Sequence, residues 1–448
     1  MWVVPTLTDP VEFATEVVKQ TLSAGATQAE AAITVGERFS VEARGQTVTK
    51  LEQSTANSLA LRVYLGERKA LLHTSDFEPR SLGDSIARLL AGAAHVAPDR
   101  CAGLPEDMQA VDDLDLKLFA TDVVERDAQS KIREAQDLEA AIRAWDARID
   151  NSNGARYADA VVTSVLVNSL GFAGSYRGTR ATRGVSPVAS DGANKRTASY
   201  NTAGRSVRAM ESVQSVAENA ARRTVEMFGA RKPQTMRVPV IFERDVAAAV
   251  LADIFSALSG ANVAVGNSFL GGKIGDRIGS GLATIVDDGR LPGGLGTVPY
   301  DGEGVATGRT IFFERGTLRS YALDTYYGRK LSMVSTGNAQ SGGIGPNNVY
   351  LEAGTSTLEE LIAATSRGVL VMDTIGFATE YATGTYSRGA RGFQIENGEL
   401  AYPIEEFSIA GTFPAMLAGI DAVANDLRFD STVVSPSFRV AEMTVSGN

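Results

Sequence analysis

Residues of the types that usually hold zinc in proteins are scarce in this sequence of 448 residues. It contains two histidines, His73 and His95, and one cysteine, Cys101, all in the first quarter of the chain. Zinc sites in proteins draw mainly on histidine and cysteine. His73 ends an apolar alternating segment and His95 follows a helical run, so we expect both to be ordinary structural or surface residues. A histidine-assisted serine or cysteine nucleophile would have to recruit one of them, which gives that mechanism little support.

One carboxylate is notable because of the helix predicted to carry it. The apolar segment 238–242 predicts a strand, and Asp245 is placed to cap a helix that continues to about Ser259. Bulky side chains share one face of this helix, and the opposite arc holds small residues: Ala248, Ala249, Ala252, Ser256, Ser259 and Gly260. We expect both sides to be packed, as in a core helix. Asp253, at the border of the small arc, then needs a partner or contact with water.

Familiar nucleotide-binding and nucleophile motifs are incomplete in this chain. The segment 271–274 resembles the end of a phosphate-binding loop, but Asn267 replaces its first glycine and Ile274 its hydroxyl residue. No dinucleotide fingerprint lies between a strand and a helix, and segment 385–389 lacks the first glycine of a serine-hydrolase elbow. The acidic residues of the 287–303 region lie in turn contexts, so we interpret them first as turn formers.

The pattern of apolar residues changes near residue 231. Up to residue 230, helical segments accompany long alternating segments, including a hairpin at 58–74, which indicates a two-layer α/β domain. From residue 231, short apolar runs alternate with glycine-containing turns, which is typical of a mainly antiparallel, barrel-like β domain. The expected fold class is therefore α+β, with an N-terminal domain at 1–230 and a C-terminal domain at 231–448 that opens with the 245–260 helix.

Several finer features are also predicted. We expect separate strands at 30–35 and 38–43, a loop at 97–116, and a long polar helix over 116–149 that is either continuous or broken near Ser130. A helix over 356–367 that begins with a capping box is also expected.

A strand is expected at 174–190, and it carries three arginines at intervals of three residues. Arg177, Arg180 and Arg183 would form a basic strip along it, or a solvated face paired with nearby acids.

Composition limits the classes of partner and compartment. The net charge of −10 disfavours binding to nucleic acid or to an anionic membrane. A single cysteine permits no disulfide within the chain and fits a reducing compartment. No uncharged apolar segment approaches the roughly 18 residues of a membrane span, and the N-terminus lacks the pattern of a signal peptide. We expect a soluble, cytoplasmic protein.

Four segments of the C-terminal half have an uncommon arrangement: SFLGGKIGDRI at 268–278, residues 286–331, STGNA at 335–339, and GTYSRGARGFQIENGELAYPIEEFSIAG at 384–411. Together they resemble the TldD/PmbA family, and within it the PmbA/TldE branch. The N-terminal half is similar only in layout.

The resemblance implies a specific outcome for zinc. In this family the TldD-type subunit carries a His-Glu-x-x-x-His helix which, with a later cysteine, binds a peptidase zinc, whereas the PmbA/TldE-type subunit lacks this motif. In this sequence Ala252 and Ala257 correspond to the two histidines, Asp253 to the glutamate, and a position near Ser435 to the cysteine. An alanine methyl group cannot bind a metal, so the resemblance implies no catalytic residue and no zinc in this chain, with zinc in a TldD-type partner.

The resemblance also implies a cleft between the domains that accepts extended peptides by strand addition. Candidate contacts with substrate or partner are Gly271, Gly272, Tyr386, Ser387, Arg388 and Gly389. We interpret residues 384–389 as a glycine-flanked loop that presents Tyr386 and Arg388, which are residue types enriched at interfaces. The alternative is a tight connection whose arginine binds backbone carbonyls. Gly271 and Gly272 would allow close backbone approach, or simply form a turn.

Three hypotheses about function follow. The first is a non-catalytic subunit of a cytosolic zinc metallopeptidase, which pairs with a TldD-type subunit to proteolyse unfolded peptides in peptide maturation or antitoxin turnover, and which forms a homodimer when alone. The second is a stand-alone hydrolase that uses Asp253 with Ser256 or with a carboxylate of the 287–303 region. The third is a non-enzymatic binding module, since the family is linked by name to modulation of DNA gyrase.

Overall fold

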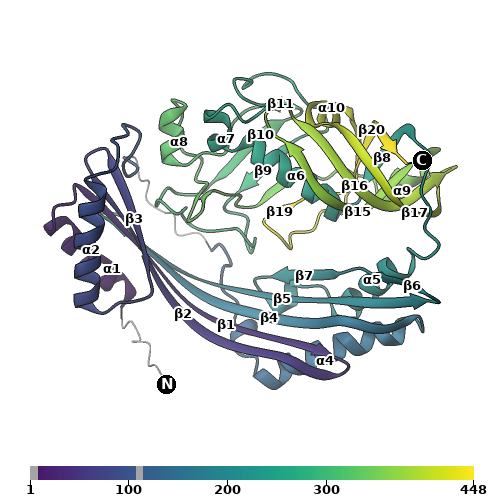
Figure 1. Cartoon of the computed structure of the whole chain (residues 1–448), viewed down its shortest axis with the longest axis horizontal. Coiled ribbons are helices and arrows are strands. Elements are labelled where there is room, and N and C mark those ends of the chain that lie inside the picture. The colour runs from purple at the N-terminus through teal and green to yellow at the C-terminus, as the bar shows by residue number, and fades with distance from the viewer. Residues whose placement is uncertain (1–8, 107–114, 448) are drawn as a thin grey trace.

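The computed structural model of the chain describes residues 9–106 and 115–447. Two bodies of secondary structure face each other, and the first of them is built on a long curved sheet (Figure 1). The first body contains the following elements: α1 (Pro10–Ser23), β1 (Gln28–Arg44), β2 (Thr47–Leu65), β3 (Arg68–Thr74), α2 (Pro79–Ala93), α3 (Thr121–Val124), α4 (Ala128–Trp145), β4 (Ile149–Asn168), β5 (Ala173–Asp191), β6 (Asn194–Thr197), β7 (Tyr200–Gly204), the 3-10 turn η1 (Val207–Ala209) and α5 (Val213–Val225).

The sheet of this first body is antiparallel, with the strand order β3-β2-β1-β4-β5-β6, and β7 pairs with β5. Alternation along β1 explains its two faces. Ile33, Phe39 and Val41 are buried against α1 and α4, whereas the opposite face carries polar residues such as Arg38 and Ser40. Helices therefore cover the outer face of the sheet, and its concave face is turned toward the second body (Figure 1).

The second body contains the remaining elements: β8 (Met236–Phe242), α6 (Arg244–Leu258), α7 (Gly260–Ala264), β9 (Ile285–Asp288), β10 (Arg309–Glu314), β11 (Thr317–Leu318), α8 (Thr325–Lys330), β12 (Ala339–Gln340), β13 (Gly343–Ile344), β14 (Val349–Leu351), α9 (Leu358–Ala363), β15 (Arg367–Glu380), β16 (Thr385–Glu396), β17 (Glu399–Thr412), α10 (Phe413–Gly419), β18 (Ile420–Val423), β19 (Val433–Val434) and β20 (Phe438–Ser446).

A barrel dominates this second body. Its sheet has the order β17-β16-β15-β8-β20-β18, and it closes on itself because β17 also pairs with β20. Apart from the parallel pair β8 and β15, these pairings are antiparallel. A single apolar core joins this sheet to α6 and to the smaller sheet β11-β10-β9-β14-β19. The predicted α+β class with a barrel-like second half is confirmed.

Several finer predictions differ from the structure. The two strands expected at 30–35 and 38–43 are one strand, β1, because it pairs along its length with both β2 and β4. The exposed polar first half of β2 lacks apolar alternation and was not predicted. Of the two forms expected for the helical segment 116–149, continuous or broken near Ser130, the broken form is found, since Asp127 caps α4 separately from α3. The capping box of α9 is confirmed at Thr357 and Glu360, while part of the expected 97–116 loop lies outside the described residues.

Buried acids join the two bodies near α8. Glu30 of β1 lies 2.9 Å from Arg62 of β2, and Arg62 lies 3.6 Å from Glu303 of the second body. Glu303 also accepts a hydrogen bond from the backbone of Thr325. Burial raises the pKa of Glu30 to about 7, and burial together with Glu303 raises the pKa of Asp301 to about 7. These carboxyl groups therefore take up protons on folding in mildly acidic solution.

This arrangement predicts a pH dependence of stability. A carboxyl group whose pKa is raised by folding stabilises the native state fully below its unfolded pKa, and that contribution is lost as the pH rises through the folded value. Glu30→Gln mimics the protonated group. Relative to the natural chain, this variant should gain on the order of 1 kcal/mol of unfolding free energy between pH 5.5 and 7.5. Urea unfolding at several pH values measures the gain, and parallel pH profiles would contradict the assignment.

Within the described ranges, no helix has the length and apolar character that crossing a lipid bilayer requires.

Candidate functional site

A cavity of about 1020 Å³ lies between the concave face of the long sheet and the second body. Strands β5 and β7 provide one wall. Helix α6, strands β15 and β16, and the segment 428–435 provide the other. Cavities of this size are typical of ligand sites that form between two bodies of structure.

Helix α6 forms the centre of the second wall. Its N-cap is Glu243, two residues before the expected Asp245, and the Glu243 side chain accepts a hydrogen bond from the backbone of Asp245. Its bulky face is buried in the core as predicted. We expected the small-residue arc to be packed against protein, and this is true only of its C-terminal part, where Ser259 and Gly260 are buried. Ala248, Ala249 and Ala252 instead line the cavity together with Asp253. Small side chains on this arc therefore leave room for the cavity.

The positions that the sequence resemblance matches to a zinc motif offer few atoms that could bind a metal. Ala252 presents a methyl group to the cavity. Ala257 is fully buried, and its backbone carbonyl accepts a hydrogen bond from Ser268 at 2.6 Å. Ser435 does line the cavity, but its hydroxyl donates to the carbonyl of Pro436 at 2.8 Å. Zinc prefers thiolate, imidazole and carboxylate ligands, and this set offers only the carboxylate of Asp253.

That carboxylate already has a cationic partner. Arg388 of β16 lies 2.7 Å from Asp253, and both side chains are largely buried. The hydroxyl groups of Thr379 and Tyr381 lie at 3.3 and 3.4 Å and complete the surroundings of Asp253. A guanidinium group in this position neutralises the carboxylate and would repel a metal ion. The structure thus brings together two residues that the sequence singled out separately.

The other candidate contact residues occupy different surroundings. Residues 385–389 belong to strand β16, so the loop expected at 384–389 is wrong, although Arg388 does donate to a backbone carbonyl, that of Gly376. Tyr386 lies at the cavity wall, but its ring packs edge-on against Phe413 in the core and is only 2 % exposed.

The remaining four candidates are three glycines and a serine in less enclosed positions. Ser387 and Gly389 are half-buried on β16, where they pair with β15 and β17. Gly271 and Gly272 lie in an exposed turn, and the φ angle of +72° at Gly272 favours glycine there. Neither of these two glycines is among the residues that line the cavity.

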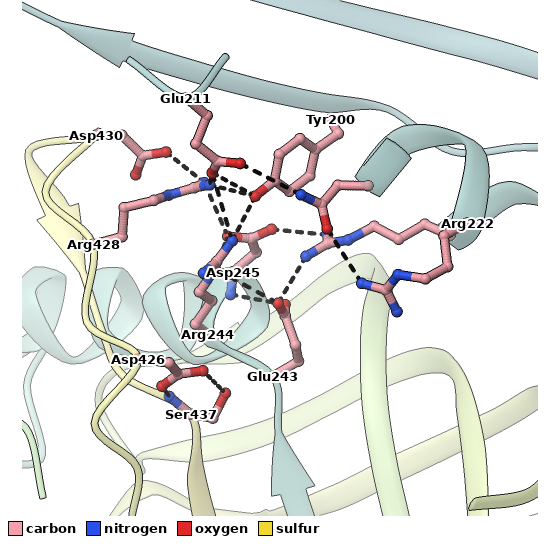
Figure 2. Close-up of polar contacts among 12 residues, drawn as sticks. Tyr200, Glu211, Arg222, Glu243, Arg244, Asp245, Asp426, Arg428, Asp430 and Ser437 are labelled. Atoms are coloured by element: carbon pink, nitrogen blue, oxygen red, sulfur yellow. Dashed lines mark hydrogen bonds and ion pairs between the residues drawn. The ribbon is translucent and has the colours of Figure 1, made fainter. Parts of the chain in front are cut away.

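An arginine–carboxylate cluster closes one end of the cavity, and Figure 2 shows most of its members. We define it by the following residues: Tyr200, Glu211, Arg223, Glu243, Arg244, Asp245, Arg428 and Asp430. Arg223 bridges Glu243 and Asp245 at 2.7 and 2.8 Å. Arg428 pairs with Asp430 at 2.5 Å and with Glu211.

This cluster holds the two bodies of the protein together. Tyr200 and Glu211 come from the first body, and Arg244 and Arg428 come from the second. The hydroxyl of Tyr200 accepts a hydrogen bond from Arg244 at 2.5 Å and donates one to Glu211 at 2.8 Å. Burial raises the pKa of Tyr200 to about 12, so it stays a neutral donor at physiological pH. No local pattern in the sequence predicts this cluster, because its members are up to 230 residues apart.

Comparisons with known proteins agree with the arrangement of the two bodies. Residues 122–228 match the model of the PmbA/TldA metallopeptidase central domain, and residues 235–447 match that of the C-terminal domain. The Metalloprotease PmbA homolog of Haemophilus influenzae is 34% identical over 99% of this chain and 96% of its own. Metalloprotease PmbA of Escherichia coli is 31% identical over 94% of this chain and 92% of its own.

Solved structures show the same fold. A protein of Bacteroides thetaiotaomicron described as a candidate modulator of DNA gyrase superposes with a TM-score of 0.91 at 25% identity, covering 98% of each chain. TldE from Thermococcus kodakarensis superposes with a TM-score of 0.89 at 21% identity, covering 97% of this chain and all of its own. The full-length relatives and both family models show that this chain belongs to the PmbA/TldD family.

Proposed function

We propose that this chain is the TldE-like, non-catalytic subunit of a zinc metallopeptidase and that it forms a heterodimer with a TldD-type subunit. In this proposal the partner carries the zinc and the chemistry, and this chain supplies one wall of a chamber for unfolded peptides. The proposed setting is the cytoplasm, in peptide maturation or antitoxin turnover.

The observation that carries the proposal is the face that α6 turns to the cavity. It presents Ala252 where a metal donor would be needed, and it presents Asp253 already paired with Arg388 at 2.7 Å. Neither side chain is available to bind zinc or to activate a water molecule. The chain nevertheless has a cavity of about 1020 Å³, which is consistent with a role in holding a substrate rather than in cleaving it.

Two kinds of evidence support a paired subunit. One structural neighbour is named TldE, and one homologue, from Buchnera aphidicola, is named Metalloprotease TldD homolog. The TldD-named protein is 25% identical over 41% of this chain. Two related subunits with a shared fold can combine through equivalent surfaces, as is common in oligomers.

The alternative of a stand-alone hydrolase finds no support in the geometry. The hydroxyl of Ser256 donates to the carbonyl of Ala252 within the same helix, at 3.0 Å, so it is not paired with a base. Asp287 is buried and accepts hydrogen bonds from Asn338 and Asn347, away from the cavity wall.

Direct DNA binding is not part of the proposal. Two solved relatives are described as candidate modulators of DNA gyrase, but the net charge of −10 disfavours contact between this chain and a phosphate backbone.

Reconstitution tests the proposal. This chain and a TldD-type subunit are purified separately, and cleavage of an unfolded peptide is measured for each protein and for the mixture. Efficient cleavage is expected only from the mixture, and Asp253→Asn in this chain should change its rate less than about twofold, since Asp253 has no chemical role. Cleavage by this chain alone, abolished by Asp253→Asn, would contradict the proposal.

A further inference from the structure

One arginine side chain in the cavity differs from the other cations there, because it has no hydrogen-bonding or ionic partner within the described part of the chain. Six arginines and no lysines line the cavity: Arg180, Arg223, Arg244, Arg388, Arg391 and Arg428. Five of these arginines form ion pairs with nearby carboxylates. The side chain of Arg180 on β5 is exposed and makes no ion pair or hydrogen bond with any residue that the structure describes.

Alternation along β5 explains why Arg180 points into the cavity. Residues three positions apart on a strand lie on opposite faces, so of the two arrangements that the sequence allowed for Arg177, Arg180 and Arg183, the single basic strip is wrong. Arg183 is buried on the helix side, where it pairs with Glu134 of α4 at 2.9 Å. Arg177 lies on that same side, with its guanidinium 4.5 Å from the ring of Phe119. Only Arg180 faces the concave side.

Arg180 lies at the end of the cavity where other parts of the chain begin to cover strand β5, and we call this the closed end. On the concave face, Gly174 lies under the ring of Tyr300, since a Cβ at this position would be 2.5 Å from it. Gly178 lies under Arg205, because a Cβ there would be 2.8 Å from Nη1 of that arginine. The next residues on this face, Arg180 and Thr182, line the open cavity. The part of β5 that Tyr300 and Arg205 cover therefore ends at Gly178, and Arg180 is the next residue on this face.

A second cation next to Arg180 is also without a counter-charge. Arg205 donates its hydrogen bonds to the backbone carbonyls of Thr179, Gly294, Leu295 and Thr297. Carbonyl groups satisfy its donors but do not cancel its charge. Burial lowers the pKa of Arg205, and the nearby positive charge of Arg180 lowers it further, because both disfavour the charged form of the guanidinium. This end of the cavity thus has a local positive potential in a protein of net charge −10.

We propose that Arg180 is a specificity-determining residue that binds a carboxylate of an extended peptide at the closed end of the cavity. The inference rests on the proposed function, in which the cavity receives unfolded peptides, and it adds the preferred class of substrate. An arginine fork binds a carboxylate with two parallel hydrogen bonds. The carboxylate comes either from an acidic side chain or from the C-terminus of the peptide.

Binding of labelled peptides to the full chain, measured by fluorescence anisotropy at low salt, tests this inference. The peptides are identical except for one central residue (Glu, Gln or Lys, each with an amidated C-terminus) and for a Gln version with a free C-terminal carboxylate. The Glu peptide or the free-carboxylate peptide should bind about tenfold more tightly than the amidated Gln peptide. Whichever of the two gains affinity identifies the source of the carboxylate.

Substitutions at two exposed arginines of the same strand separate specificity from general effects. Arg180→Glu should abolish the preference for the carboxylate and should favour the Lys peptide instead, whereas Arg180→Lys should keep part of the preference. Arg177→Glu is the matched control, because it faces away from the cavity, and it should leave all affinities unchanged.

The outcomes distinguish this inference from the proposed function. If all the peptides bind with equal affinity, or if the preference survives Arg180→Glu, the specificity role of Arg180 is overturned while the peptide chamber remains. If no peptide binds, both the inference and the peptide-holding role are contradicted.

Discussion

Replacing Arg428 with methionine is expected to lower the free energy of unfolding by about 3 kcal/mol. The guanidinium of Arg428 lies among Glu211, Asp430 and Asp245, and its side chain is only 21% exposed. Burial alone would lower the pKa of Arg428. The nearby carboxylates and Tyr200 outweigh burial and raise this pKa above its ordinary value. Removing one partner from a partly buried ionic cluster leaves the other charges without compensation, which costs more than the pair itself contributes.

Urea unfolding of the full chain measures this effect. Arg319→Met is the matched control, since Arg319 pairs with Glu314 at 2.8 Å on the surface and both side chains are about half exposed. An exposed pair contributes little, so this variant should lose less than about 0.5 kcal/mol. Equal losses in the two variants would show that the arginine–carboxylate cluster does not hold the two bodies together.

The second large effect on stability is expected at the ion pair of Asp253 and Arg388, in which Asp253 corresponds to the glutamate of the zinc motif. Arg388→Ala should lower the free energy of unfolding by about 2 kcal/mol, because it leaves the Asp253 carboxylate largely buried without its cation. In a double-mutant cycle with Asp253→Asn, the coupling energy should be about 1 kcal/mol. A coupling of this size means that Asp253 serves the structure of the cavity wall.

A neighbouring pair provides the reference for this cycle. Arg391 of β16 binds Asp373 of β15 at 2.5 Å, but these side chains are 31% and 44% exposed. Their coupling should be below about 0.5 kcal/mol. If the Asp253–Arg388 coupling is no larger than this value, Asp253 is not held as a structural residue, and a chemical role for it has to be considered.

Local patterns in the sequence were sufficient to predict much of the secondary structure of the second body. The apolar spacing at 245–259 located α6 to within one residue at each end, because a helix is encoded by side chains three and four positions apart. The capping box of α9 was readable for the same reason. By contrast, the first half of β2 is a strand only because β1 pairs with it, and its exposed polar residues carry no alternation.

The candidate site was harder to predict, because its contacts are not local. Asp253 and Arg388 are both visible in the sequence, but nothing near either residue indicates that they meet across 135 positions. The arginines of β5 illustrate a different limit. Their spacing of three left a single strip and pairing with nearby acids both open, whereas the two-residue period of a strand places Arg180 at the cavity and Arg183 on the helix side, where it pairs with Glu134.

The most direct measurement is the zinc content of this chain, alone and in complex with a TldD-type subunit, by elemental analysis together with native mass spectrometry. The account predicts a heterodimer with one zinc ion per complex, which stays with the TldD-type subunit on dissociation, and no stoichiometric zinc on this chain by itself. Zinc bound tightly and stoichiometrically by this chain alone would contradict the central claim that its α6 helix no longer carries the chemistry of the family.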